Sequence, residues 1–276
     1  MKPDASTTPN VLWESSNPDV AIVDNTGKVT ATGAGTSIIT ITTATSTANG
    51  DKLKAQVPVV VSPLFKDSDN AYKDNATIIL GEGVSNKTFE TNTKYATSLA
   101  WEIYDHENKL IPQSETTRLI RDIHSYNGNI ELTNLKAGTY TIKAYPDIKY
   151  KGDVKITPLE IKLIVPIHIQ NTNIIMNQGD HIRLTDISNV YDPAIFNYSI
   201  GSGVPTTVSI TPSKGRIDSN HEGSVEIHLD YLPSSGLYDG SYTPSRKTIN
   251  VTVIDGISLN HTSATIYKTG TIQLVA

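Results

Sequence analysis

The chain has 276 residues and a formal net charge of −5, with 23 Lys and Arg against 28 Asp and Glu. This mild acidity argues against a nucleic-acid scaffold, which usually shows a basic surplus on one face. The absence of cysteine excludes disulfide frameworks, thiol nucleophiles and cysteine-based zinc sites together. No apolar run is long enough to span a membrane. The length suits two or three domains of about 100 residues each.

Strand-forming residues dominate the composition. Thr, Ile, Val and Tyr favour the pleated, half-buried surface of strands, and 18 Gly and 14 Pro supply frequent turns. No stretch holds a helical apolar period over three turns; residues 116–124 come nearest and suit a strand or a single turn equally well. The sequence therefore predicts an all-β chain of short strands, in sandwiches or barrels.

The polar start, Met1 to Ser6, has no apolar core of a signal peptide. We therefore expect one of two cases: the protein is not secreted through a signal peptide, or the chain is a piece of a longer precursor. The patterns at the two ends of the chain favour the piece of a longer precursor.

The first 62 residues read as strands separated by turn clusters. The turn 24–28 contains Gly27, which can adopt a positive φ and so close a hairpin. A second turn cluster covers residues 15–19. The expected strands are residues 11–13, 20–23, 29–32, 37–43 and 54–61.

The run from Val11 to Thr43 carries a family pattern. It meets V-x-W-x-S-x-N-P-x-V-A-x-V and then D-x-x-G-x-V-x-A-x-G-x-G-x-x-x-I at nearly every position. In this it resembles the group 2 bacterial immunoglobulin-like (BIG2-type) domain. The resemblance implies a β-sandwich module of tandem surface proteins, such as intimin-like adhesins, and of some phage virion proteins. It also implies that Trp13 is a core anchor and not a platform for stacking a ligand.

The last segment, residues 257–276, reads as two strands joined by a turn at Gly270. It resembles the opening of the same family, I-x-L followed by L-x-x-G-x-x-x-x-L-x-A. Residues 1–62 would then lack their opening strands, and residues 257–276 would be the opening strands of another domain.

Three interpretations of these ends stay open. The chain is a fragment of a longer tandem protein; or residues 257–276 of one molecule complete the first segment of the next, head to tail; or the chain folds back and completes its own first domain.

The middle of the chain divides into two further expected sandwiches, residues 63–166 and 167–256. Residues 66–75 read as a polar, charged linker. The expected strands are residues 76–80, 98–104, 109–111, 129–132, 139–145 and 159–169 in the first of these, and 173–176, 181–184, 196–200, 207–210, 224–229 and 247–254 in the second.

Leu135 to Tyr140 matches the L-x-x-G-x-Y of a tyrosine corner, so the Tyr140 hydroxyl is predicted to bond back to the backbone. Residues 239–242 resemble a second Gly-x-Tyr turn. The whole chain is therefore expected to be all-β, with tandem immunoglobulin-like β-sandwiches.

The polar residues offer few candidates for a metal or nucleotide site. Residues 81–88 approach a phosphate-binding loop, but Asn86 stands where the second Gly is needed and no helix is expected to follow, so a strand-to-strand loop is the better interpretation. The candidate metal pairs are His168 with His181 and His221 with His228, against exposed strand or turn histidines. Asp67, Asp69 and Asp74 are candidate calcium ligands in the linker, against a plain solvated segment.

Catalytic and sugar-binding groups are equally sparse. Asp105, Glu107, Asp147 and Asp153 are scattered and make no glycosidase pair. Tyr231, Tyr238 and Tyr242 are candidates for stacking on sugar rings, against a role in the core or its rim. The sequence therefore predicts no catalytic, cofactor-binding or metal-ligating residue, and no enzyme.

The expected function is structural: an adhesive tandem segment of a bacterial cell-surface protein that spaces or presents a binding tip. Its expected partners are a surface protein or glycan of a host or neighbouring cell, and its own copies head to tail; nucleic acid and membrane insertion are not expected. The expected location is extracellular or on the cell surface. The alternatives are a phage decoration or tail module, and a carbohydrate-binding accessory module of a surface glycan-processing protein.

Overall fold

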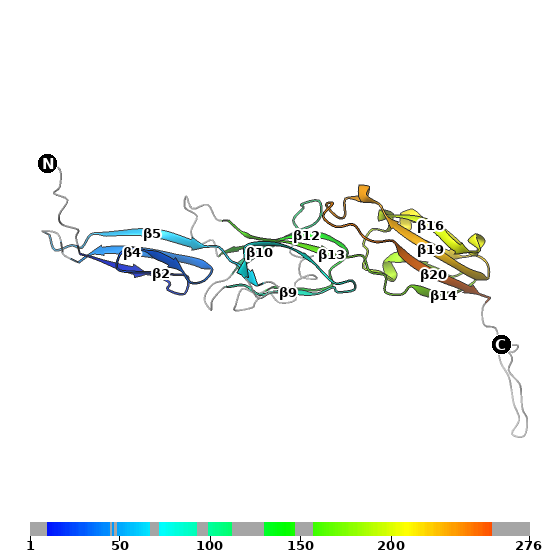
Figure 1. Ribbon diagram of the computed structural model, residues 1–276, viewed down its shortest axis with the longest axis horizontal. Helices are drawn as coiled ribbons and strands as arrows, with labels where there is room; N and C mark the ends of the chain where they lie inside the picture. The colour runs from blue at the N-terminus through cyan, green and yellow to red at the C-terminus, as the bar shows by residue number, and fades with distance from the viewer. Residues whose placement is uncertain are drawn as a thin grey trace, which may run out of the picture. The chain divides into compact units, whose positions relative to one another are not determined.

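The computed structural model describes residues 10–44, 46, 49–66, 72–92, 99–111, 130–146 and 157–255. Over these residues the chain forms β-strands and short 3-10 turns, and the strands face one another in paired sheets (Figure 1). The expected class, all-β with tandem immunoglobulin-like β-sandwiches, is confirmed. The chain divides into two compact units, Met1–Pro166 and Ile167–Ala276. The described part contains no helix long and apolar enough to cross a membrane.

The first sandwich pairs a three-stranded sheet, ordered β1-β4-β5, with a two-stranded sheet, β2-β3. All of these pairings are antiparallel. The strands are β1 (Val11–Ser15), β2 (Ala21–Val23), β3 (Val29–Ala31), β4 (Gly35–Thr43) and β5 (Lys54–Val61). Each overlaps an expected strand, because short runs of β-branched and aromatic residues bounded by turn residues mark them locally.

The turn between β2 and β3 packs against the large aromatic of β1. Gly27 has φ +83°, as the hairpin required, and a Cβ there would lie 2.6 Å from Cζ2 of Trp13. The glycine thus lets the turn come down onto the indole ring. Trp13 is itself half-buried, so the core role that the resemblance implies for it stays a prediction.

The second sandwich places a four-stranded sheet, ordered β10-β12-β13-β8, over the pair β11-β9. Its strands are β6 (Phe65–Lys66), β7 (Tyr72–Lys73), β8 (Asn75–Ile79), β9 (Lys87–Phe89), β10 (Leu99–Tyr104), β11 (Ile130–Leu132), β12 (Gly138–Pro146) and β13 (Leu159–Val165). A continuous apolar core fills the space between the sheets. Residues 116–124, the best helical candidate, lie outside the described residues.

The prediction of a polar linker over residues 66–75 is wrong at both of its ends. Lys66 belongs to β6, which pairs with β7, and β8 begins at Asn75. Phe65, next to the expected linker, is 0% exposed and meets the ring of Phe89 edge-to-face at 6.3 Å. Charged residues dominate the sequence around β6 and β7. A pairing of only two residues in each strand is too short to give a recognisable strand pattern there.

The tyrosine corner predicted at Tyr140 is confirmed. Its hydroxyl donates a hydrogen bond of 3.1 Å to the carbonyl oxygen of Lys136. Burial of the ring raises the pKa of Tyr140 to about 12. The bond ties the start of β12 to the loop before it, as such corners do in immunoglobulin-like sandwiches.

We expect Tyr140→Phe to lower the free energy of unfolding of this unit by about 1 kcal/mol, because the Lys136 carbonyl loses its partner while the ring stays in the core. Urea titrations followed by tryptophan fluorescence measure the change. Ile79→Val is the control, since Ile79 lies in the same unit and is 53% exposed, and the loss of one methyl group there should not change stability. Equal stabilities of the two variants would contradict the corner's contribution.

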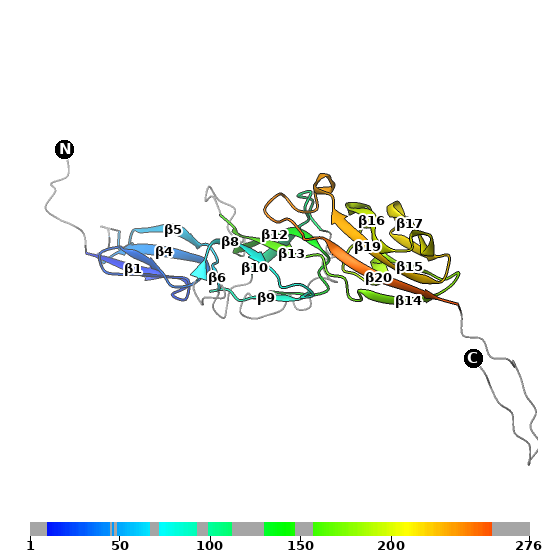
Figure 2. The same cartoon turned by 45° about the vertical axis from the view of Figure 1, so that its right-hand side comes forward.

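The third sandwich has a four-stranded sheet ordered β14-β20-β19-β16 and a three-stranded sheet ordered β15-β18-β17 (Figures 1 and 2). Its strands are β14 (Asn173–Asn177), β15 (His181–Arg183), β16 (Phe196–Gly203), β17 (Val208–Thr211), β18 (Arg216–Ser219), β19 (Gly223–Tyr231) and β20 (Lys247–Ile254).

Five 3-10 turns connect the strands of the third sandwich: η1 (Leu184–Asp186), η2 (Pro193–Ile195), η3 (Pro205–Thr207), η4 (Pro212–Lys214) and η5 (Pro233–Ser235). Four of these turns begin with proline, whose fixed φ suits the first position of a helical turn.

Candidate functional site

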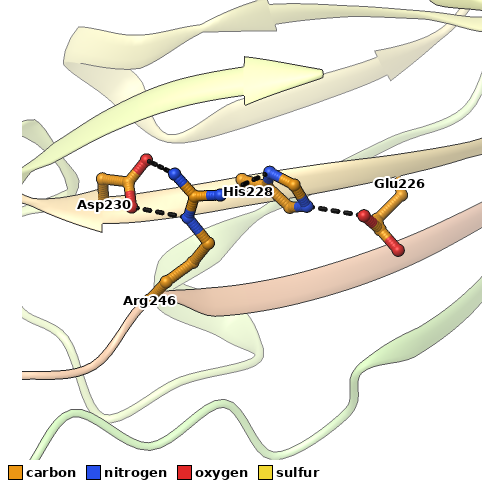
Figure 3. A network of polar contacts seen from close by, with 4 residues as sticks. All are labelled: Glu226, His228, Asp230 and Arg246. Carbon is orange, nitrogen blue, oxygen red and sulfur yellow. Dashed lines mark hydrogen bonds and ion pairs between the residues drawn. The ribbon is translucent and has the colours of Figure 1, made fainter. Parts of the chain in front are cut away.

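A ladder of charged side chains runs along the outer face of the four-stranded sheet in the third sandwich (Figure 3). Glu226, His228 and Asp230 alternate with the buried residues of β19, so all three point away from the core. Arg246 joins them from the residue before β20, next to the pair that Lys247 makes with Leu229. Strand alternation and register therefore assemble this cluster from two segments of the chain.

The hydrogen bonds of the ladder fix the roles of its members. Arg246 donates to both carboxylate oxygens of Asp230, from Nε at 2.7 Å and from Nη2 at 2.9 Å. Its Nη1 lies 3.2 Å from Nδ1 of His228. A guanidinium cannot accept a hydrogen bond, so Nδ1 is the acceptor and the imidazole proton is on Nε2.

That Nε2 proton points at Glu226, whose Oε1 lies 2.5 Å away. Gly201 of β16 makes room for this pair, since a Cβ there would lie against both His228 and Glu226. Each charged group of the ladder thus has a partner within it. The arrangement holds two strands together on an open sheet face and leaves no unpaired base or nucleophile among its four members.

We expect the Asp230–Arg246 pair to make stability depend on pH. The hydrogen bond from Arg246 lowers the pKa of Asp230 below its ordinary value of 3.8. A lowered pKa in the folded state stabilises the fold above the unfolded value, and this stabilisation is lost as the pH falls through the lowered one. Asp230→Asn should therefore be less stable than the parent at neutral pH and equal to it in strong acid. Urea midpoints at both pH values test this; a difference that persists in acid would contradict it.

The three tyrosines considered for sugar stacking form a cluster of their own beside β19. Tyr238 is 4% exposed and meets the rings of Tyr231 and Tyr242 edge-to-face, at 5.5 Å and 4.9 Å. The Tyr231 hydroxyl accepts a hydrogen bond from the backbone N–H of Tyr238. These contacts use the rings to fix the loop after β19, which favours the interpretation as core and rim.

The structure does not bring either candidate histidine pair together. The His168 N–H donates to Oδ1 of Asn189, and the His168 carbonyl oxygen accepts from the Asn189 N–H. His181 instead begins β15, just past the turn at residues 177–180, so His168 lies beside the segment after β15 and His181 lies at the start of that strand. His221 lies in the turn before β19 (Gly223–Tyr231), whereas His228 lies within that strand. The five residues from Gly223 to His228 alone span roughly 16 Å of extended strand.

The described residues contain no group of three His, Asp or Glu side chains placed to hold a metal ion. Asp67 and Asp69 lie outside the described residues, and Asp74 stands immediately before β8. Residues 81–86 form a loop with a turn, in which the Val84 N–H donates to the Gly81 carbonyl, and β9 begins at Lys87 where a helix would be needed. The expectation of a strand-to-strand loop is confirmed there.

Sequence reasoning missed the charged ladder and a second buried tyrosine contact. Tyr198 of β16 donates to the Pro193 carbonyl at 2.9 Å, and burial raises its pKa well above the usual range. The sequence shows Glu226, His228 and Asp230 at alternate positions, which places them on one face of a strand. That Arg246 joins them follows only from the register of β20 against β19.

Comparison with known families finds a match in the first sandwich. Residues 8–45 match the family model described as the intimin, immunoglobulin-like domain. This supports a bacterial immunoglobulin-like domain in that part of the chain. A search of curated proteins found no match.

Several solved structures are similar to this chain at low sequence identity and low TM-score. Mouse protocadherin-24 EC1-3 is 17% identical, with 91% of each chain covered and a TM-score of 0.21. Drosophila N-cadherin EC1-3 is 11% identical, with 90% of each chain covered and a TM-score of 0.25. Human CDH23 EC21-23 is 15% identical, covering 90% of this chain and 91% of that one, with a TM-score of 0.27. Similarities of this size say nothing about what the present chain binds.

Proposed function

We propose that the chain is an adhesion-type segment of a bacterial cell-surface protein, in which group 2 immunoglobulin-like and related sandwiches space or present a binding tip. The observation that carries this proposal is the match of residues 8–45 to the immunoglobulin-like domain of intimin. The charged ladder adds support, since its groups neutralise one another on an open sheet face. Such a surface suits a spacer and offers no assembled catalytic group.

Surface exposure is the first test. An antibody against the chain should label intact cells of the producing bacterium, and external protease should remove the label. Labelling that needs permeabilised cells would overturn the proposal, and labelling confined to released virions would favour a phage decoration or tail module instead.

Binding is the second test. The labelled chain is added to host cells and to neighbouring bacterial cells, either untreated or pretreated with protease or periodate, and bound label is counted by flow cytometry. Saturable binding that protease abolishes indicates a protein partner, and binding that periodate abolishes indicates a glycan. Exposed labelling without binding to any cell would assign the chain a spacing role alone.

A further inference from the structure

The three-stranded sheet β15-β18-β17 (Figure 2) carries two arginines directly opposite each other on its outer face. Arg183 of β15 is the register partner of Arg216 of β18. Both point away from the core, because the buried Ile217 follows Arg216 and side chains in register share a face of the sheet. Like charges in this position are destabilising. The sheet therefore holds two arginines side by side at some cost to its stability.

One carboxylate on the same face meets these two arginines. Asp218 is the only acidic residue in the three strands, and it lies two residues beyond Arg216 on the same side of β18. It accepts a hydrogen bond from Nε of Arg216 at 2.7 Å and lies 2.6 Å from Nη2. Arg183 is exposed and makes no hydrogen bond or ion pair with any residue that the structure describes. One of the two guanidinium groups is thus without a carboxylate partner in this part of the chain.

Two further carboxylates flank β15, and each is bonded within its own turn. Oδ2 of Asp180 accepts from the backbone N–H of Asn177 at 3.0 Å, and Oδ1 of Asp186 accepts from the hydroxyl of Thr185 at 3.4 Å. Among the described residues neither carboxylate forms an ion pair with Arg183. They leave the guanidinium group of Arg183 open to an external anion.

Positive charge gathers at this sheet although the sandwich as a whole is acidic. Residues 167–255 contain five Lys and Arg against nine Asp and Glu. Three of the five cations are Arg183, Arg216 and Lys214, which is exposed in η4, the turn that leads into β18. The other two, Arg246 and Lys247, stand at the start of β20 in the other sheet, where the charged ladder neutralises Arg246. The outer face of β15-β18-β17 is therefore where this sandwich meets an anion best.

Two guanidinium groups on one face favour a particular kind of anion. The two oxygens of a carboxylate are filled by a single arginine, as Arg246 fills those of Asp230 in the ladder. A sulfate ester has three terminal oxygens, so it can accept hydrogen bonds from two guanidinium groups at once. Nucleic acid fits less well, because β15, β17 and β18 contain no Phe, Tyr or Trp on which a base could stack.

We propose that this face binds a sulfated polysaccharide, with Arg183 and Arg216 donating to one sulfate ester and Lys214 pairing with another. These three cations exceed the carboxylate of Asp218 by two charges, and two sulfate esters balance that surplus. The exposed Thr211, beside Arg216 in register, is placed to bond a sugar hydroxyl. The inference names a partner class for the surface role proposed above, and it rests on that role only for which cell displays the polymer.

Binding of the full chain to immobilised heparin, measured by surface plasmon resonance over a series of salt concentrations, tests the proposal. We expect saturable binding that weakens as the salt concentration rises, because salt screens exposed charges, and no binding to heparin stripped of its sulfate groups. Arg183→Glu should lower the affinity at least about tenfold, since charge-assisted hydrogen bonds are lost and a repulsive charge is added. Lys52→Glu is the matched control: it makes the same change in net charge at an exposed position outside this sandwich, and it should bind as the parent does.

The same substitution separates binding from folding. Arg183→Glu replaces a like-charge pair across β15 and β18 with an opposite-charge pair, so hydrogen exchange of β18 should become slower while heparin binding is lost. Arg183→Lys keeps the charge without the planar fork, and its affinity should lie between those of the parent and Arg183→Glu. Loss of binding together with faster exchange of β18 would make Arg183 a structural residue and overturn the proposal.

Three other results would overturn it as well: a parent chain that does not bind heparin at low salt, equal binding to desulfated heparin, or equal losses for Arg183→Glu and Lys52→Glu. Each of these results leaves the proposed function standing if the chain is exposed on cells of the producing bacterium. A chain that binds heparin through Arg183 but is not exposed on those cells would support the site and overturn the proposed function instead.

Discussion

Phe65→Ala is expected to lower the free energy of unfolding of the unit Met1–Pro166 by about 3–5 kcal/mol. Phe65 is fully buried and its ring meets Phe89 edge-to-face at 6.3 Å, in the core between β12, β13 and the strands that face them. Removing the ring leaves a cavity that the two sheets cannot close without moving. The size of the decrease in unfolding free energy distinguishes a residue that anchors the core from one at the edge of a solvated linker.

Tryptophan fluorescence in a urea titration isolates this effect. Both tryptophans of the chain, Trp13 and Trp101, lie in the unit Met1–Pro166, so their signal does not follow the other unit. Ile79→Ala is the control, because that side chain is 53% exposed and its truncation should cost well under 1 kcal/mol. A loss for Phe65→Ala no larger than the control's would show that residue 65 belongs to a solvated linker after all.

Gly203→Ala is expected to destabilise the third sandwich by about 2–5 kcal/mol. Gly203 has φ +92°, which costs an alanine roughly 1–2 kcal/mol. It also ends the irregular stretch of β16 after Ile200, and a Cβ there would press on the Ser224 carbonyl oxygen and lie 2.8 Å from Cα of Val225. Both are backbone atoms of β19, so no side-chain rotation relieves the contact, and overpacking adds about 1–3 kcal/mol.

Gly236→Ala separates these two causes. Gly236 has φ +70°, but a Cβ there meets no atom within 4 Å, so only the conformational cost remains. Hydrogen exchange of β19 and β20 in both variants measures the difference. If Gly203→Ala costs no more than Gly236→Ala, β16 does not lie as close to β19 as its pairing implies.

The sequence by itself determined the features that depend on neighbouring residues. It predicted the all-β class and bounded β5 at residues 54–61, because a short valine-rich run next to turn residues marks a strand locally. It also predicted the positive φ of Gly27 and the hydroxyl bond of Tyr140, since each follows from a motif of a few residues. Two-residue strands such as β6 and β7 were missed, because too few residues alternate to make a pattern.

Only the tertiary structure decided what depends on residues far apart in the chain. The parallel pairing of β14 with β20 joins Asn173 to Asn250, and that register has no local signature in the sequence. The same holds for Arg246, which completes the ladder from another strand, and for the candidate histidine pairs, which strand geometry keeps apart. Alternation along a strand predicts which side chains share a face. Contacts between strands depend on their register and on the packing of the sheets, and no short stretch of sequence determines either of these.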